Sequence, residues 1–336
     1  MGKTLYELSH ELNVSTATLS RVLNGDSRVS AATRDRILSE LSARNYTPRK
    51  RRRSVAAQNS GTAMIIAGQL NNPITLGYID DIRRRLAESG LRTLISLSDY
   101  DSSTECGLIR YAASSGFAGI FMLNVVESQQ LIELMSGLGL PVVLVNRYLK
   151  ALDTDVVTVD NYRCGYMATQ YLLSRGHTRI AHIAGPETSI TCRNRTQGYI
   201  DALTAAGLSP SPEDIFYGDR KYPSGYEFGR RLATSRQRCS AVFSTTALMA
   251  SGMIDALRDA GLRVPDDISV VCNDDYSKDY MPCNADITCF RQNPQLMGRT
   301  AAELLMERIA RNDIPPRRVV FPPELSEKGS VRRFEE

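Results

Sequence analysis

The 336-residue sequence contains no tryptophan, only three histidines and no Cys-x-x-Cys pair. Its seven cysteines are scattered between positions 106 and 289, so neither a zinc cluster nor a disulfide-rich scaffold is indicated. There is no run of 18 apolar residues and no apolar segment near the start that resembles a secretion signal. These absences predict a cytoplasmic protein with reduced thiols.

Sequence motifs of the common enzyme classes are also missing. The chain has no Gly-x-Ser-x-Gly elbow, no Walker loop and no Gly-x-Gly-x-x-Gly fingerprint. His182 lies within an apolar run, where a buried structural histidine is the simplest interpretation. We therefore predict that the protein is not an enzyme and that it holds no cofactor and no metal.

Positive charge is concentrated in the first 60 residues. They hold 11 Lys and Arg against 5 Asp and Glu, a net charge of +6, whereas the whole chain carries +4, so the remaining residues sum to −2. The densest part is the run Arg49-Lys50-Arg51-Arg52-Arg53. This distribution favours contact with phosphates, because each neutralised phosphate releases a counterion. A solvated linker is the alternative interpretation of the basic run.

The same region has the pattern of three short helices. Thr4 and Glu7 have the spacing of a capping box, which predicts a first helix with the apolar face Leu5, Leu8 and Leu12. Asn13 suits the tight turn that follows, and Ser15 predicts the N-cap of a second helix that ends near Leu23. A third helix is predicted from the Ser30 cap, with the buried residues Ile37, Leu38 and Leu41.

The second of these helices has two distinct faces. Leu19, Val22 and Leu23 are predicted to face the small core. The short or basic residues on the outer face are Thr16, Ala17, Ser20 and Arg21. Side chains in such positions approach base edges and phosphates in a helix-turn-helix, so the segment predicts DNA binding. The alternative is three surface helices of an ordinary domain.

The segments Leu-Tyr-Glu-Leu-Ser at 5–9, Val-Ser-Thr-Ala-Thr-Leu-Ser-Arg-Val-Leu-Asn at 14–24 and Arg-Val-Ser at 28–30 resemble the headpiece of the lactose-repressor (LacI/GalR) family. The resemblance implies that Thr16 and Ala17 select the operator, whereas Ser15, Ser20, Arg21 and Asn24 hold phosphates or nearby bases. The full set of predicted DNA contacts is Thr4, Leu5, Ser15, Thr16, Ala17, Ser20, Arg21, Asn24, Arg28, Arg49, Lys50, Arg53 and Val55.

The resemblance also implies a hinge after Pro48 that folds on the operator and inserts an apolar side chain into the minor groove. This chain departs from the usual Ala-Arg-Ser-Leu and has Arg52-Arg53-Ser54-Val55. Val55 is a shorter, β-branched wedge and a weaker helix former. We therefore expect electrostatic attraction to contribute more than helix formation to the binding of this hinge.

From Thr62 the pattern changes to short apolar runs that alternate with amphipathic stretches, which is typical of βαβ units with parallel sheets. The expected strands are 63–67, 93–96, 119–123, 141–145, 180–183, 241–244 and 269–272. About 270 residues exceed one typical core, which predicts two subdomains. The family resemblance extends over nearly the whole chain and implies the α/β architecture of periplasmic sugar-binding proteins.

The predicted fold is thus a small all-α helix-turn-helix headpiece followed by an α/β core of two parallel-sheet subdomains. The headpiece is predicted over residues 1–47, a basic hinge over 48–60, and an effector-binding and dimerisation core over 61–330. Within the core, the first subdomain is expected at about 61–157 and 287–320 and the second at about 158–286.

Effector contacts are expected just after the carboxyl ends of the strands, where ligands of open parallel sheets bind. Arg195 and Asp274 match the family's arginine clamp and its acceptor for sugar hydroxyls, with surface ion pairs as the alternative. Two departures from the family are Thr246-Ala247 in place of Asn-Asp and Ile74-Thr75 in place of two aromatics. The remaining candidates at strand ends are Asn124, Asn146, Arg147 and Asp160, for which helix capping or interdomain packing is an equal alternative.

These observations predict a transcriptional regulator, most simply a repressor, that binds a palindromic operator as a homodimer under the control of a small polar metabolite such as a sugar. A co-repressor, a non-sugar effector or no effector at all are alternatives within the family. A small-molecule binding or transport module is the alternative from a different class. The predicted partners are double-stranded operator DNA, the effector and a second copy of the chain, with no membrane.

Overall fold

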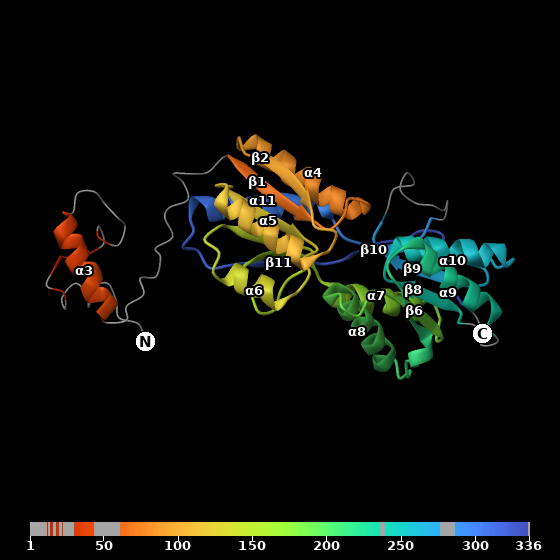
Figure 1. Cartoon of the computed structure of the whole chain (residues 1–336). Helices are drawn as coiled ribbons and strands as arrows, with labels where there is room; N and C mark the ends of the chain where they lie inside the picture. The colour runs from red at the N-terminus through yellow and green to blue at the C-terminus, as the bar shows by residue number, and fades with distance from the viewer. Residues whose placement is uncertain are drawn as a thin grey trace. The chain divides into compact units, whose positions relative to one another are not determined.

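The computed structural model describes residues 12, 14, 15, 18, 19, 22, 30–43, 61–235, 239–275 and 286–334. The chain divides into two compact units, Met1–Ala57 and Gln58–Glu336 (Figure 1). None of the helices among these residues combines the length and the apolar character that a membrane crossing requires.

The first unit contains a small apolar core. It is formed by Leu12, Leu19, Val22, Ile37 and Leu41, with Val14 packed beside it. The Ser15 hydroxyl accepts a hydrogen bond from the Thr18 amide at 3.0 Å, which confirms the predicted cap. Ser30 caps α3 (Ala31–Ala43) in the same way, through the Thr33 amide at 3.3 Å.

One expectation for this core is wrong. Leu38 was expected to be buried, but its side chain is 43% exposed. Ile37 and Leu41 are four residues apart and share one face of α3, whereas Leu38 is rotated by about 100° from Ile37. The face that packs against Leu19 and Val22 therefore excludes Leu38.

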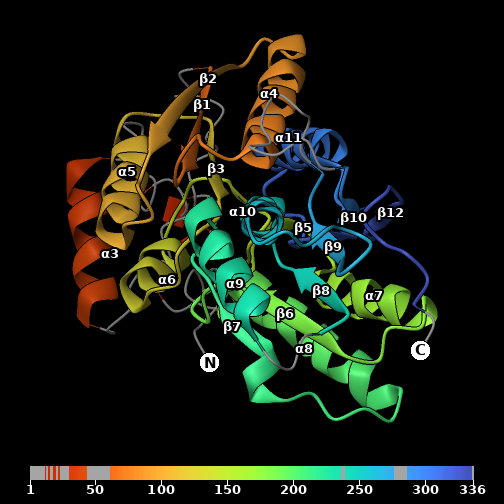
Figure 2. The same cartoon turned by 90° about the vertical axis from the view of Figure 1, so that its right-hand side faces the viewer.

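The second unit begins with a six-stranded sheet in the order β11-β5-β4-β3-β1-β2, in which all neighbours are parallel. Its strands are β1 (Thr62–Ala67), β2 (Arg92–Leu97), β3 (Gly119–Leu123), β4 (Val142–Val145), β5 (Asp155–Val159) and β11 (Arg318–Phe321). Helices α4 (Pro73–Glu88) and α11 (Pro294–Ala310) lie side by side on one face, and α5 (Ser102–Ser114) and α6 (Gln129–Ser136) cover the other (Figures 1 and 2).

Alternation along β1 explains these two layers. Ala63, Ile65 and Ala67 belong to the core under α4 and α11, whereas Met64 and Ile66 belong to the core under α5 and α6. Successive side chains of a strand point to opposite faces, so a continuous apolar run can serve both layers. The strand is therefore buried on both sides, as its sequence predicts.

The second sheet has the order β12-β10-β9-β8-β6-β7. Its strands are β6 (Ile180–Ala184), β7 (Ile215–Tyr217), β8 (Ala241–Ser244), β9 (Ser269–Asn273), β10 (Thr288–Arg291) and β12 (Glu324–Ser326). The pair α7 (Asn161–Ser174) and α8 (Ile190–Ala205) packs on one face, and the pair α9 (Tyr222–Thr234) and α10 (Ala247–Asp259) packs on the other. A short 3-10 helix, η2 (Pro212–Asp214), precedes β7. β12 pairs antiparallel with β10, so this sheet is mixed rather than wholly parallel.

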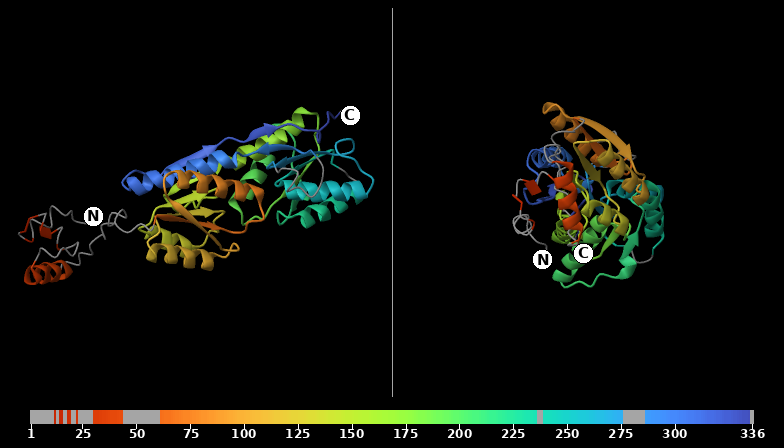
Figure 3. Two further views of the ribbon diagram at one scale, coloured as in Figure 1. Left: turned by 90° about the horizontal axis from the view of Figure 1, so that it is seen from above. Right: turned by 60° about the vertical axis from the view of Figure 1, so that its left-hand side comes forward.

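The chain crosses between the two sheets three times, after β5, after β10 and after β11. The last crossing carries the C-terminal segment past both sheets (Figure 3). We expected the return to the first subdomain at residue 287, but β10 pairs with β9 in the second sheet. The crossing therefore lies after Arg291, because the ladder with β9 keeps 288–291 in the second subdomain.

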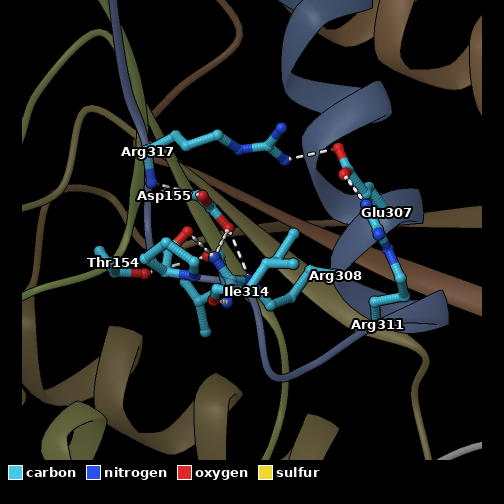
Figure 4. Close-up of polar contacts among 9 residues, drawn as sticks. Thr154, Asp155, Glu307, Arg308, Arg311, Ile314 and Arg317 are labelled. Carbon is cyan, nitrogen blue, oxygen red and sulfur yellow. Dashed lines mark hydrogen bonds and ion pairs between the residues drawn. The ribbon is translucent and has the colours of Figure 1, made fainter.

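A buried ion pair fixes the return of the chain from α11 to β11 (Figure 4). The Arg308 guanidinium lies 2.8 Å from the carboxylate of Asp155, and the side chains are 10% and 1% exposed. Asp155 also accepts from the Arg317 amide at 2.9 Å. Arg308 donates to the carbonyl oxygens of Ile314 and Pro315, so the whole segment is tied to the first strand position of β5.

Candidate functional site

The carboxyl ends of the strands carry an unusual backbone. Every described residue other than glycine with a left-handed φ lies within three positions after a parallel strand. These residues are Asp99 (φ 49°), Tyr100 (61°), Asn124 (64°), Asn146 (71°), Arg220 (71°) and Asp274 (76°). Such conformations are costly for residues with a Cβ and cluster at functional sites. The strand ends are therefore the first place to look for a binding site.

Arg195 lies in α8 and is 5% exposed. Its Nε donates to Oδ1 of Asn161 at 2.9 Å, and its Nη1 donates to the carbonyl oxygen of Thr245, after β8, at 3.0 Å. Two glycines bring α8 against α7: a Cβ on Gly165 would lie 1.9 Å from the Arg195 carbonyl oxygen, and one on Gly198 would lie 2.2 Å from that of Tyr162. This close approach places the guanidinium at the strand ends.

Asp274 directly follows β9 and is linked to the first subdomain through two side chains. Gln292 donates from Nε2 to Oδ1 of Asp274 at 2.7 Å and accepts from the Tyr78 hydroxyl at 2.7 Å. Tyr78 lies in α4, and Gln292 lies on the second crossing between the sheets. This chain of hydrogen bonds therefore joins a helix of one subdomain, a crossing segment and a strand end of the other.

Burial is the largest single influence on the pKa values of Asp274 and Arg195. It raises the pKa of Asp274, and the nearby Arg195 guanidinium opposes that rise. Burial also disfavours charge on Arg195, but Asp274 is the largest of the effects that favour it, and the pKa of Arg195 is raised overall. The pair therefore offers a charged donor and a carboxylate acceptor in a dry site, which suits a ligand with hydroxyl groups.

A second group of polar residues follows β3 and β4. Asn146 donates to Oδ1 of Asn124 at 2.5 Å, and Asn124 donates to the Thr75 hydroxyl at 3.3 Å. Arg147 is 8% exposed and donates from Nη1 to the carbonyl oxygens of Asn124 at 3.2 Å and Val125 at 3.5 Å. The structure thus brings Asn124 and Arg147 together, in agreement with their predicted position.

Three predicted effector contacts also have structural roles. Asp160 accepts from the Arg163 amide at 2.9 Å and caps α7. Thr246 accepts from the Met249 amide at 3.3 Å and caps α10. Ile74 is 6% exposed and packs in the apolar core under α4. Their contact with an effector stays a prediction. The two helix caps and the packing of Ile74 already account for the residue type at each position.

Four residues at the strand ends were missed by sequence reasoning: Tyr78, Tyr100, Arg220 and Gln292. Tyr78 lies one helical turn after Thr75, so it could have been found from the helical period. Gln292 directly follows Thr288–Arg291, a short apolar strand that was not predicted. Arg220 follows the equally short β7. Tyr100, Arg220 and Gln292 share one signal, a position within three residues after a strand, whereas Tyr78 lies in α4.

His182 is a satisfied core residue, as predicted. It is fully buried, with Nδ1 at 3.0 Å from the Phe243 carbonyl oxygen and Nε2 at 3.1 Å from the Thr196 hydroxyl. Burial lowers its pKa to about 4, so the ring is neutral at physiological pH. No cluster of three metal-ligating side chains occurs in the part of the chain that the structure describes.

Glu105 in α5 is a buried acid beside this site. It is 2% exposed, accepts from the Val126 amide at 3.3 Å, and lies 3.5 Å from the Ser98 hydroxyl. Burial raises its pKa from 4.5 to about 7. The folded protein therefore holds the Glu105 proton more tightly than the unfolded chain does. Protonated Glu105 contributes its full stabilisation of the fold below about pH 4.5, and this contribution is lost as the pH rises through about 7.

We expect Glu105→Gln to stabilise the protein at pH 8 by on the order of 2–3 kcal/mol relative to wild type, and to change stability little at pH 4.5. Glutamine reproduces the neutral acid, since its oxygen can accept from Val126 and its amide can donate to Ser98. Urea unfolding followed by circular dichroism at both pH values measures this difference. Glu127→Gln, which changes an exposed carboxylate, is the control. A difference between Glu105→Gln and wild type that does not grow with pH would contradict the prediction.

Most of the predicted DNA contacts lie outside the described residues. These are Thr4, Leu5, Thr16, Ala17, Ser20, Arg21, Asn24, Arg28, Arg49, Lys50, Arg53 and Val55. Ser15 is described, and its hydroxyl caps the second helix. A cap of this kind leaves amide groups at a helix N-terminus, which suits phosphate binding.

Comparison with known proteins decides the family. Residues 4–49 match the family model described as bacterial regulatory proteins, lacI family, and residues 169–331 match that of a periplasmic binding protein-like domain. The transcriptional regulator CelR of Thermobifida fusca is 31% identical over 334 residues, covering 97% of this chain and 98% of CelR. The chain belongs to the LacI family.

Other LacI-family proteins agree along the full length. The transcriptional repressor CytR of Escherichia coli K12 is 29% identical and covers 98% of this chain and 96% of its own. The solved complex of CelR with cellobiose has a TM-score of 0.75 at 30% identity, over 98% of this chain and 99% of that one. The lac repressor dimer bound to operator shares the fold, with a TM-score of 0.73 at 22% identity over 99% and 100%.

The LacI-family assignment confirms the main expectations from the sequence. The chain is a DNA-binding transcriptional regulator with a helix-turn-helix headpiece and a periplasmic-binding-like α/β core. Tyr78, Arg195, Asp274 and Gln292 form one group of neighbouring side chains at the strand ends. Arg147 and Arg220 lie near one another at the ends of β4 and β7. These six residues are hereafter the strand-end site. The roles of individual residues in DNA or effector binding remain predictions.

Proposed function

We propose that the protein is a repressor that binds a palindromic operator as a homodimer, and that a small polar effector held at the strand-end site changes its affinity for the operator. It has no catalytic role in this proposal. The hydrogen bonds from Tyr78 through Gln292 to Asp274 support the effector role most strongly. A ligand that contacts these three hydrogen-bonded side chains touches both subdomains at once. It can therefore favour one arrangement of the subdomains over another.

An exposed apolar edge supports dimerisation. β2 lies at the end of the first sheet, and its side chains Leu94, Ile95 and Leu97 are 42%, 40% and 44% exposed. An exposed edge strand with apolar side chains is a place where another chain can pair, and exposed apolar patches mark interaction sites. We propose that the partner copy covers this edge. A dimer is also required for function, because each headpiece alone contacts too few bases for specificity across a genome.

The test is selection of preferred sites from random-sequence DNA with the full chain at physiological salt. We expect a palindrome that binds at least about a thousandfold more tightly than random DNA. Arg21→Ala should weaken binding to all sequences about tenfold and reduce its salt dependence, whereas substitutions of Ala17 should change the preferred bases. Equal binding to the palindrome and to random DNA would refute the proposed function. An unchanged preference in Ala17 variants would refute only the register of the recognition helix.

A further inference from the structure

We infer that the effector carries a negative charge, as a carboxylate or a phosphate group, and that Arg147 and Arg220 receive this group from the two subdomains. The inference rests on the proposed function, because it names the chemical class of the ligand of that same site. The strand-end site differs from a neutral sugar site in one respect. Two further cations, Arg147 and Arg220, supplement the proposed hydroxyl-binding pair Arg195 and Asp274.

Arg147 contributes from the first subdomain. It follows β4, and its side chain is 8% exposed. Nη1 is occupied by the main-chain carbonyl oxygens of Asn124 and Val125, but the buried Nε has no hydrogen-bond partner among the described residues. A buried donor without a partner costs free energy, and an acceptor atom on a ligand would remove that cost.

Arg220 contributes from the second subdomain. It follows β7 with a left-handed φ of 71°, and the centre of its guanidinium lies 5.7 Å from the centre of the Tyr100 ring. Tyr100 is held by Gly68, where a Cβ would lie only 2.1 Å from the ring. The buried Nε of Arg220 also lacks a partner among the described residues. Tyr100 thus orients the second cation across the boundary between the subdomains.

The two guanidinium groups repel one another. Burial lowers the pKa of Arg147 to about 10, and the charge of Arg220 is the second cause of this shift. Like charges placed together in a dry site destabilise a protein unless an anion lies between them. The bidentate geometry of guanidinium groups suits the oxygens of a carboxylate or a phosphate.

The neighbouring carboxylates do not neutralise this pair. No carboxylate among the described residues forms an ion pair with Arg147, Arg195 or Arg220. Asp101 and Asp160 cap helices, Asp219 accepts from the Lys221 amide and the Ser224 hydroxyl, and Asp275 pairs with Lys328. Of the buried acids, only Asp274 and Glu105 lie near these arginines among the described residues, and even with both ionised the three guanidinium groups exceed them by one positive charge.

Other unpartnered atoms nearby suit the uncharged part of such a ligand. At the strand ends, the buried side-chain oxygens of described residues that lack a hydrogen-bond partner include Asn146 Oδ1, Thr245 Oγ1 and Asn273 Oδ1. All three belong to residues at the carboxyl ends of β4, β8 and β9. They can accept hydrogen bonds from hydroxyl groups, so a polyhydroxylated anion satisfies both the unpartnered acceptors and the unpartnered arginine donors.

The test compares matched neutral and anionic ligands by isothermal titration of the full chain. The probes are glucose, glucuronate and glucose 6-phosphate, with ribose and ribose 5-phosphate as a second set. We expect at least one anion to bind about tenfold or more tightly than its neutral partner, because each charge-assisted pair contributes roughly that factor. Glucuronate and the phosphates then distinguish a carboxylate from a phosphate ligand.

Arg147→Gln and Arg220→Gln should each reduce anion binding about tenfold and leave binding of the neutral partner nearly unchanged. Arg220→Lys should retain part of the anion preference, because it retains the charge. Lys221→Gln, which removes an exposed cation next to the site, is the control. Equal binding of neutral and anionic partners, an anion preference that survives both glutamine variants, or no binding of any anion overturns the inference. The site selection described above tests operator binding separately. If it yields a palindrome while the titrations show no anion preference, the DNA-binding function stands and only the anionic class of effector is wrong; if it yields none, that function fails as well.

Discussion

We expect the Arg195→Ala variant to lose its response to effector while it binds operator within about threefold of the wild-type affinity. Arg195 donates to Asn161 and to the Thr245 carbonyl oxygen, and its charge compensates Asp274. Without it, a ligand loses a buried charged donor, which lowers effector affinity by about a hundredfold. The measurement is operator binding with and without any compound that shifts the wild-type protein.

Arg195 is buried, so its removal can also lower stability, and two further variants address this. Arg195→Lys keeps the charge but lacks the planar fork, and we expect it to remain folded and to respond weakly. Arg193 lies two residues away on the same helix and is exposed. The Arg193→Ala variant should therefore respond normally to effector. A normal effector response in Arg195→Ala would exclude Arg195 from the site. If no small molecule alters operator binding by the wild type, the effector role itself fails.

The coupling has a thermodynamic consequence. If effector changes operator affinity by some factor, operator must change effector affinity by the same factor, commonly about 5–150-fold. Titration of the effector into the free protein and into the operator complex measures this directly. Gln292 lies on a crossing between the sheets and forms hydrogen bonds to both Tyr78 and Asp274. We therefore expect Gln292 to couple effector binding to the arrangement of the two subdomains.

The second large effect concerns stability. We expect Asp155→Ala to lower the free energy of unfolding by about 3–5 kcal/mol. The substitution leaves the Arg308 guanidinium without its carboxylate in a site where it is 10% exposed, and it also leaves the Arg317 amide without its acceptor. Urea unfolding followed by circular dichroism is the appropriate measurement, since the chain has no tryptophan.

An exposed ion pair in the same neighbourhood provides the matched control. Glu307 pairs with Arg311 and Arg317 at 2.7 Å each, and all three side chains are between 35% and 64% exposed (Figure 4). Solvent screens such pairs, so Glu307→Ala should cost about 0–1 kcal/mol. Equal losses for Asp155→Ala and Glu307→Ala would show that burial of the Asp155 pair does not govern its contribution.

Local features of the sequence predicted the structure best where neighbouring residues decide the outcome. The Ser15 and Ser30 caps depend on a side chain and an amide three residues apart, and both were predicted. Strands such as β1, β3 and β8 are buried on both faces, so their continuous apolar runs are visible without knowledge of the fold. The family resemblance supplied the register of Arg195 and Asp274.

Only the tertiary structure decided what depends on distant partners. β10 was assigned to the wrong subdomain because its sequence does not reveal that β9 is its neighbour, and the antiparallel β12 was not predicted at all. The hydrogen bond from Tyr78 to Gln292 joins residues 214 positions apart. Arg220 influences the charge of Arg147 although the two residues follow strands of different sheets, β7 and β4. Sequence therefore determined the DNA-binding headpiece, the family and the parallel α/β architecture, whereas the charge and connectivity of the strand-end site arise from side chains that long-range packing brings together.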